Sequence, residues 1–298
     1  MELHTPFSST LVSPAELNHA LSNTSKDVRI IPVAAGRNPS LPHFESRQIP
    51  GSVFFNMDEI RNKESEYLMM LPTPTQFAES MTKLDILPED VLVIYDSLEA
   101  GLYSSPRVAW MCKHFGHKAV HVLNNFPRYV EQGFPVSSGS LSTTSSSVPR
   151  AEYPEQPVAH TDNVVSFDEM RDLVEIPESR ANLQILDSRP SSRFSGTPDV
   201  EQTPLPVGHV PFAVNVPLPS LLGPDKGILS QADLKNVFMN AGVKDSTPAV
   251  LYCNSGVTAA ALDLALRTSG MNIETRLYDG SWSEWVKRAD KDSMIVNN

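Results

Sequence analysis

The fold is decided by one stretch, Val250-Leu251-Tyr252-Cys253-Asn254-Ser255-Gly256-Val257-Thr258-Ala259. Its apolar start is typical of a buried parallel strand, and the run from Ala259 to Leu266 is typical of a helix. A strand, a tight loop and a helix N-terminus place Cys253 where backbone N–H groups converge and the helix dipole is positive. These surroundings favour the thiolate, which is the reactive form of cysteine. We therefore expect Cys253 to be a nucleophile that can hold a second sulfur atom as a persulfide.

The composition is that of a globular chain. Its 298 residues suit two domains of ordinary size, and 40% hydrophobic residues are enough for packed cores. A formal net charge of −11 argues against nucleic acids and anionic membranes as partners. No apolar run approaches the roughly 20 residues of a membrane helix, and the start of the chain lacks the pattern of a signal or transit peptide.

The two cysteines, Cys112 and Cys253, lie in different sequence contexts, so a disulfide is not expected. Free thiols predict a reducing compartment, either the cytoplasm or, as an alternative, mitochondria. Cys112 lies in a helical run without an activating turn, and we expect it to pack in a core. The scattered histidines and the unpaired cysteines show no metal-ligand spacing.

One order of strands and helices occurs twice along the chain. The first half predicts strands at 29–34, 48–55, 91–95 and 119–123, and helices that begin at Ser13 or span 75–84 and 106–115. The second half predicts strands at 184–187, 208–216, 249–252 and 274–278, and helices at 166–174, 231–241 and 258–269. Pro50 and Pro211 are separated by nearly the same distance along the chain as Asp96 and Cys253, which indicates an internal repeat. Alternating strands and helices predict an α/β fold, with a parallel sheet covered by helices on both faces in each copy.

A polar, low-complexity run at 137–149 separates the two copies and is typical of a linker. We therefore predict a first domain over 1–136, a linker over 137–160 and a second domain over 161–298. In the first copy Asp96 occupies the position of Cys253 and offers no nucleophile, so we expect catalysis in the second domain. Pro32 is expected to weaken the first strand.

Several residues of the loop can take part in chemistry. Gly256 lets the backbone approach the sulfur, and the N–H groups from Asn254 through Val257 to Thr258 can stabilise a thiolate, a persulfide or an oxyanion. Thr258 either caps the helix or donates its hydroxyl to sulfur. A buried structural cysteine is the alternative for Cys253. A cysteine-dependent phosphatase would need an arginine six residues after the cysteine, where this chain has Ala259.

The run Cys253-Asn254-Ser255-Gly256-Val257-Thr258-Ala259 resembles the active-site loop of two-domain sulfurtransferases, the rhodanese and 3-mercaptopyruvate sulfurtransferase family. The resemblance extends over nearly the whole chain and implies two tandem rhodanese-like domains without a cofactor or a metal. It implies transfer of sulfane sulfur from 3-mercaptopyruvate or thiosulfate to cyanide or a thiol, through a persulfide on Cys253. The implied partners are a small anionic sulfur donor and a thiol acceptor such as thioredoxin.

The loop is similar to the mercaptopyruvate type, because Asn254 and Ser255 are neutral. In that type the serine helps to polarise the substrate carbonyl; alternatively Ser255 is a turn residue. The segment from Asp187 to Thr197 resembles a family segment in which Arg193 falls on the arginine that binds the substrate carboxylate. We expect Arg189, by contrast, to pair with an acidic neighbour.

Three positions in the family pattern concern catalysis. Asp58 matches an aspartate that lies beside the serine. Met69 stands where the mercaptopyruvate type has a histidine, and Gln202 stands where it has a second arginine. The two departures motivate an alternative function, a degenerate family member that carries a persulfide or binds proteins with weak turnover.

One further family dipeptide differs between the copies. The second copy keeps it as Asp279-Gly280, followed by Trp282 and Trp285, which we expect in the core. The first copy has Asn124-Asn125 at this position.

Overall fold

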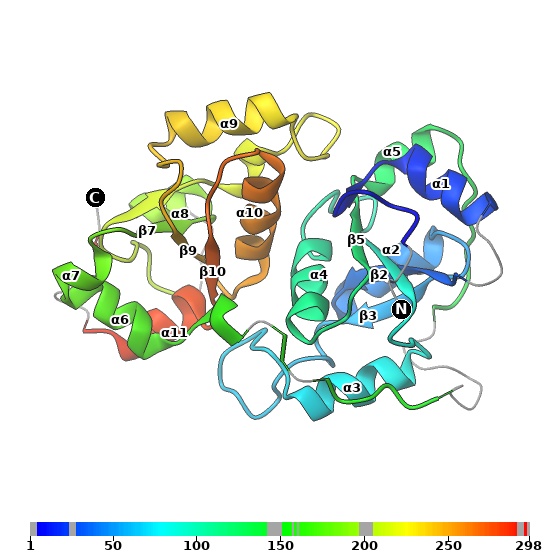
Figure 1. Cartoon of the computed structure of the whole chain (residues 1–298), viewed down its shortest axis with the longest axis horizontal. Coiled ribbons are helices and arrows are strands. Elements are labelled where there is room, and N and C mark those ends of the chain that lie inside the picture. The colour runs from blue at the N-terminus through cyan, green and yellow to red at the C-terminus, as the bar shows by residue number, and fades with distance from the viewer. Residues whose placement is uncertain are drawn as a thin grey trace. The chain divides into compact units, whose positions relative to one another are not determined.

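The computed structural model of the chain describes residues 5–23, 28–141, 151–156, 158–159, 161–196, 205–290 and 295–296. The chain forms two compact units (Figure 1). Unit 1 comprises Met1–Glu64, Leu71–Thr161 and Pro224–Ile228, and unit 2 comprises Ser65–Met70, Asp162–Gly223 and Leu229–Asn298. Each unit therefore includes one short segment that the other half of the sequence contributes.

Unit 1 is built on a five-stranded sheet in the order β1-β5-β4-β2-β3, in which every pairing is parallel. The strands are β1 (Leu11–Val12), β2 (Ile30–Gly36), β3 (Val53–Asn56), β4 (Val91–Tyr95) and β5 (Val120–Leu123). The helices are α1 (Pro14–Asn23), η1 (Asn38–Ser40), α2 (Leu41–Ser46), α3 (Pro74–Lys83), α4 (Ser105–His114) and α5 (Phe126–Glu131).

Unit 2 repeats this plan with a five-stranded parallel sheet in the order β6-β10-β9-β7-β8. The strands are β6 (Val164–Val165), β7 (Gln184–Asp187), β8 (Ala213–Asn215), β9 (Ala249–Tyr252) and β10 (Thr275–Tyr278). The helices are η2 (Thr161–Asn163), α6 (Phe167–Glu175), α7 (Pro177–Arg180), α8 (Ser191–Ser195), η3 (Leu218–Leu221), α9 (Gln231–Asn240), α10 (Val257–Thr268) and α11 (Ser281–Arg288).

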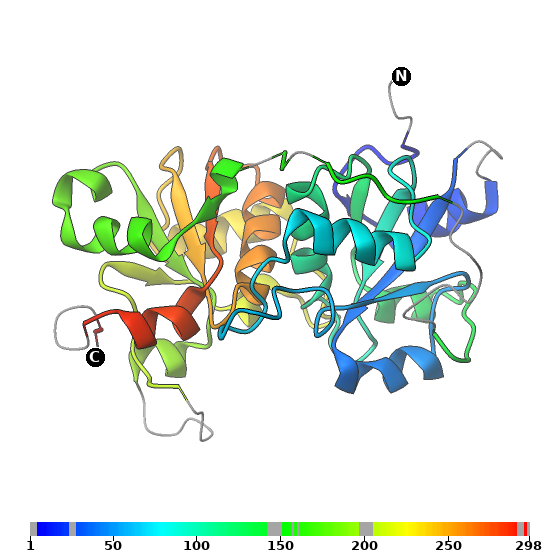
Figure 2. The same ribbon diagram turned by 90° about the horizontal axis from the view of Figure 1, so that it is seen from below.

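The two sheets have the same strand order when their strands are numbered along the chain, and helices flank both faces of each sheet (Figure 2). The internal repeat and the α/β fold class are therefore confirmed. None of the described helices combines the length and the apolarity needed to cross a membrane.

Local sequence explains where α1 begins. The Glu16 N–H donates to Ser13 Oγ over 3.2 Å, and the Ser13 N–H donates to the Glu16 carboxylate over 2.8 Å. The expected start of this helix at Ser13 is confirmed as a reciprocal capping box. The hydrogen bonds from Ser13 lower the pKa of Glu16, although burial acts in the opposite direction.

The expectation that Pro32 weakens its strand is wrong. β2 is an interior strand, and its residues from Ile31 to Gly36 are buried. It pairs with β4 from Ile30 onward, but with β3 only from Val33 onward. Pro32 therefore stands where one side of the strand needs no backbone donor, so that the missing N–H costs the sheet little.

The expected core residues are buried. Trp282 and Trp285 lie in the core of unit 2 with 1% and 0% of their surface exposed. Cys112 is buried in α4, and burial raises the pKa of its thiol to about 12. A thiol with this pKa stays protonated at neutral pH, which agrees with a packing role.

Candidate active site

Cys253 directly follows β9, at the carboxyl end of the sheet of unit 2. The strands on either side of β9 are β10 and β7, so the loops that follow these three parallel strands lie along the same edge of the sheet. Ligand sites of open α/β sheets lie at this edge. The Cys253 side chain is buried, with 2% of its surface exposed.

The start of α11 holds the cysteine loop from one side. The Cys253 N–H donates to Ser281 Oγ over 3.2 Å, and the Cys253 carbonyl accepts from the Trp282 N–H over 2.9 Å. The Asn254 carbonyl accepts from the Ser283 N–H over 3.0 Å. Three hydrogen bonds to two consecutive residues fix the backbone that carries the thiol.

Gly256 turns the chain from the loop into α10. It has a left-handed φ of 77° and occupies the N-cap position, and no side chain caps the helix there. Within the described part of the chain, no acceptor is recorded for the N–H groups of residues 254–258. The first N–H groups of a helix have no partner inside the helix. The helix N-terminus thus lies where the sequence predicts it, directly after the loop that carries the thiol.

The hydroxyl of Thr258 is engaged with the end of β7. Thr258 Oγ1 lies 2.8 Å from Ser188 Oγ, and the Ser188 N–H donates to the Tyr252 carbonyl over 3.1 Å. The interpretation of Thr258 as the helix cap is wrong, because Gly256 is the N-cap and Thr258 lies inside the first turn. Ser255 is partly exposed, and no hydrogen bond of its hydroxyl is recorded among the described residues.

Arg189 forms the expected structural ion pair. Its Nη2 lies 2.6 Å from Asp187 Oδ2, and 4% and 0% of the two side chains are exposed. The same nitrogen donates to the Gly208 carbonyl over 2.7 Å, and the guanidinium lies 4.2 Å from the centre of the Trp282 ring. Burial alone lowers the pKa of Arg189, but the charge and the hydrogen bonds of Asp187 outweigh it and raise the pKa.

Arg193 has different surroundings on α8, which follows β7 at the same edge of the sheet. Its backbone is fixed, since its N–H donates to the Pro190 carbonyl over 2.9 Å and its carbonyl accepts from the Gly208 N–H over 3.0 Å. Among the described residues, no carboxylate pairs with its half-buried guanidinium. Arg193 thus differs from Arg189, whose guanidinium is paired with Asp187. Gln202 lies outside the described residues.

Asp58 belongs to unit 1, where it follows β3. Its carboxylate accepts from Arg37 Nε over 2.7 Å and from the Asn38 N–H over 2.9 Å. Burial raises the pKa of Asp58, but these two bonds and the charges of Arg37 and Arg61 outweigh it, so that the pKa is lowered. Both oxygens thus have partners within unit 1.

Met69 belongs to unit 2, although the first half of the chain supplies it. Its side chain is 4% exposed, and its φ is 65°. In the same segment Glu66 pairs with Lys287 of α11 over 3.0 Å. This segment therefore packs on the helix whose first residues hold the Cys253 loop.

The sequence analysis did not anticipate what Asp96 does in unit 1. Asp96 follows β4 as Cys253 follows β9, and its buried carboxylate accepts the N–H groups of Tyr103, Ser104 and Ser105 over 2.9, 2.6 and 2.9 Å. The Ser105 hydroxyl also donates to it, over 2.5 Å. Burial raises the pKa of this carboxyl, against the effect of these hydrogen bonds. The donors at the start of α4 are therefore occupied by a side chain of the protein itself. An aspartate at the position of the nucleophile was the available signal.

Known proteins match this chain in sequence. The model of the rhodanese-like domain matches residues 166–288. The chain is 33% identical over 258 residues to the thiosulfate sulfurtransferase TUM1 of Saccharomyces cerevisiae, covering 84% of each chain. It is 36% identical over 253 residues to the 3-mercaptopyruvate sulfurtransferase of Homo sapiens, covering 85% of this chain and 81% of the human protein. This chain belongs to the rhodanese-like sulfurtransferase family.

The fold of this sulfurtransferase also matches that of a solved structure. The crystal structure of Tum1 from Saccharomyces cerevisiae superposes with a TM-score of 0.86 and 31% identity, over 97% of this chain and 98% of the yeast chain. Both copies of the repeat are therefore shared with that structure. No group of three or more His, Cys, Asp or Glu side chains in the described part of the enzyme is arranged to hold a metal ion.

Proposed function

We propose that this sulfurtransferase moves sulfane sulfur from thiosulfate or 3-mercaptopyruvate to cyanide or a thiol, through a persulfide on Cys253. The main support is the position of Cys253, between the end of β9 and the N-terminus of α10, in a backbone fixed by α11. The family relatives named above carry the two donors in their names.

The first half-reaction forms the persulfide. The Cys253 thiolate attacks the outer sulfur of the donor, the new S–S bond forms, and the bond from that sulfur to the rest of the donor breaks. Thiosulfate leaves as sulfite with the bonding electron pair, and 3-mercaptopyruvate leaves as the enolate of pyruvate, which takes up a proton. The negative charge that remains on the outer sulfur is stabilised by the N–H groups of residues 254–258.

The second half-reaction regenerates the thiolate. An acceptor thiolate or cyanide attacks the outer sulfur of the persulfide, and Cys253 leaves with the electron pair of the S–S bond. Because one product departs before the acceptor reacts, this is covalent catalysis with ping-pong kinetics. We propose thioredoxin as a protein acceptor, and the cytoplasm or mitochondria as the reducing compartment.

The remaining residues of the proposed site bind or orient the donor. Arg193 binds the negative end of the donor, because its guanidinium has no carboxylate partner among the described residues. Ser255 polarises the donor from the loop, and Gly256 and Val257 bring the helix N-terminus to the sulfur. Asp58 takes part in substrate binding in the proposal, in addition to its pairing with Arg37. The proposal also includes a first domain that ends at residue 136, a linker over 137–160 and a second domain that begins at residue 161.

Mass spectrometry after incubation with each donor tests the proposal directly. The wild-type enzyme should gain one sulfur atom on Cys253, and Cys253→Ser should gain none and lose all transfer activity while keeping its circular dichroism spectrum. Cys112→Ala is the matched control, since this buried thiol should neither carry sulfur nor be needed for transfer. Transfer by Cys253→Ser at the wild-type rate would exclude the assignment.

Met69 supports a second candidate function, a persulfide carrier or protein-binding module with weak turnover. A buried thioether has no proton to transfer, in contrast to a histidine at the same position. Steady-state turnover with each donor separates the two functions. If Met69→His, alone or with Gln202→Arg, raises turnover strongly, the carrier is favoured; rapid turnover by the wild-type chain excludes it.

A further inference from the structure

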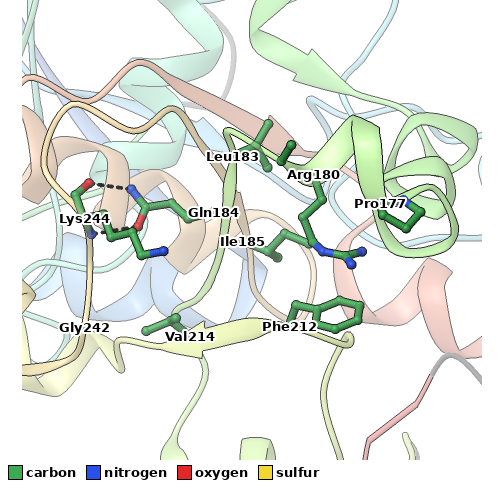
Figure 3. Close-up of a pocket in the computed structure, with 10 residues that line it drawn as sticks. Pro177, Arg180, Leu183, Gln184, Ile185, Phe212, Val214, Gly242 and Lys244 are labelled. Atoms are coloured by element: carbon green, nitrogen blue, oxygen red, sulfur yellow. Dashed lines mark hydrogen bonds between the residues drawn. The ribbon is translucent and has the colours of Figure 1, made fainter.

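A pocket lies at the end of the sheet of unit 2 opposite to Cys253. It has a volume of about 430 Å³, within the range of pockets that hold small organic molecules. Its floor is apolar and consists of Leu183, Ile185 and Val214, from β7, β8 and the segment before β7 (Figure 3). Gln184, which begins β7, also lines the pocket, whereas Cys253 follows the carboxyl end of β9. The pocket is therefore separate from the catalytic edge.

Two cations flank this floor. Arg180 and Lys244 lie on opposite sides of the pocket, with Ile185 between them (Figure 3). Arg180 Nη1 donates to the carbonyls of Leu173 and Val174 over 2.9 and 3.0 Å, so its position is fixed. None of the lining residues is acidic, and no carboxylate pairs with either cation among the described residues. Since the chain has a net charge of −11, a basic pocket is a local exception that favours an anionic ligand.

Phe212 forms one wall of the pocket in an unfavourable backbone conformation. Its φ is 67°, in the left-handed region, and 59% of its surface is exposed. Figure 3 shows the Arg180 guanidinium over the ring, and its carbon lies 3.6 Å from the ring centre. A bulky residue with a positive φ costs free energy in the unliganded protein.

The internal repeat allows the position of Phe212 to be compared with the matching position in the first copy. In the first copy, the turn before β3 is closed by the Ser52 N–H donating to the Ile49 carbonyl over 3.2 Å, and Gly51 has a φ of 80°. In the second copy, the turn before β8 is closed by the Ala213 N–H donating to the Val210 carbonyl over 3.1 Å.

Both turns have proline at the second position, Pro50 and Pro211, and a positive φ at the third. This is the type II pattern, which favours glycine at the third position. Phe212 thus stands where the same fold elsewhere in the chain has glycine. The conformation does not need a phenylalanine, so the aromatic side chain is the feature that requires explanation.

From these observations we infer that the pocket of Arg180, Phe212 and Lys244 is a binding site for a small organic anion with a flat apolar body, away from Cys253. The apolar body lies on Ile185 and Val214 and against the exposed part of the Phe212 ring. The anionic group lies beside Lys244, at the side of the floor away from Phe212 (Figure 3).

Fluorescence titration of the full chain tests this site with a matched pair of probes. The anionic probe is 1-anilinonaphthalene-8-sulfonate, and the neutral probe is N-phenyl-1-naphthylamine, which lacks the sulfonate. We expect saturable 1:1 binding of the anion, about tenfold tighter than that of the neutral probe, because one charged interaction is worth about a factor of ten.

Two variants of the pocket and one control localise the binding. Phe212→Gly restores the residue of the first copy, so it should keep or raise the melting temperature and weaken the anionic probe about tenfold. Lys244→Met keeps the aliphatic stem and should weaken the same probe by a similar factor. Lys235→Met, an exposed lysine of α9 outside the pocket, should bind like the wild type.

Sulfur transfer should stay unchanged in both pocket variants, since the pocket lies away from Cys253. Three results would each overturn the inference: equal affinity for the two probes, wild-type affinity in Phe212→Gly and Lys244→Met, or binding without saturation.

Discussion

At the scale of single residues, two arginines in one short segment have opposite surroundings. Arg189 is buried against a carboxylate, whereas Arg193 has a half-buried guanidinium without a carboxylate partner among the described residues. Burial of a charge is tolerated only with a partner, so Arg189 is committed to Asp187 and to the fold. Arg193 is therefore the arginine that we propose as the ligand of the substrate anion.

Replacement of Arg189 by methionine should therefore destabilise the protein strongly. The variant leaves the Asp187 carboxylate, which is 0% exposed, without its counter-charge. We expect a loss of about 3–5 kcal/mol in the free energy of unfolding, the usual cost of removing one partner of a buried pair. Urea unfolding measures this loss. Arg193→Met is the matched control and should unfold like the wild type; equal stability of the two variants would contradict the structural role of Arg189.

At the scale of elements, the first and second copies use the same strand–loop–helix in opposite ways. In the second copy Gly256 leads into α10, and no side chain caps this helix. In the first copy the carboxylate of Asp96 binds the N–H groups at the start of α4. A helix N-terminus attracts an anion in either case. In the first copy a side chain of the protein supplies this anion, whereas in the second copy we propose that the substrate supplies it.

Replacement of Asp96 by alanine should destabilise unit 1, because the buried N–H groups of Ser104 and Ser105, the part-buried N–H of Tyr103 and the Ser105 hydroxyl lose their acceptor. We expect a loss of about 1–3 kcal/mol in the free energy of unfolding, as for a lost cap or an unsatisfied buried donor. Urea unfolding measures this loss, with Asp58→Ala as the control variant. The pair of Asp58 and Arg37, in which 17% and 49% of the two side chains are exposed, should contribute at most about 1 kcal/mol. A smaller loss for Asp96→Ala than for Asp58→Ala would show that the Asp96 carboxylate is not an important cap.

The elements divide into those that sequence predicts and those that it does not. β9 and α10 are predictable because an apolar run, a glycine and a helix-forming run follow one another. The helices α2, α5 and α8 have five or six residues, too few turns for an apolar period to be recognised. The bond between Thr258 and Ser188 joins positions far apart in the chain, so local pattern cannot reveal it.

At the scale of the whole molecule, each half of the sequence contributes a segment to the unit formed by the other half. Met69 and Lys226 lie in these segments and are separated by the same number of residues as Asp96 and Cys253. Both have left-handed backbones, with φ values of 65° and 61°. The repeat therefore extends to the exchanged segments. Sequence alone does not show this exchange, because the partners are one hundred or more residues apart.

The exchange in unit 1 depends on specific contacts. Asn124 Oδ1 accepts from the Ile228 N–H over 2.9 Å, and Asn125 Nδ2 donates to the Asp225 carbonyl over 2.8 Å. Lys226 Nζ donates to the Glu99 carbonyl over 2.6 Å. The Asn124-Asn125 dipeptide, a departure from the family pattern, thus holds the segment that the second half contributes.

Separated halves of the chain should therefore be less stable than the same residues in the intact protein. A fragment of residues 1–160 lacks Pro224–Ile228, so its two asparagines and the Glu99 carbonyl lose these partners. We expect a lower melting temperature for this fragment than for the intact chain. A peptide of residues 222–230 should raise it in a concentration-dependent way, because a ligand that binds only the folded state stabilises it by mass action. A scrambled peptide of equal composition is the control. If the fragment melts like the intact chain, or if both peptides act alike, the exchanged segment is not a structural part of unit 1.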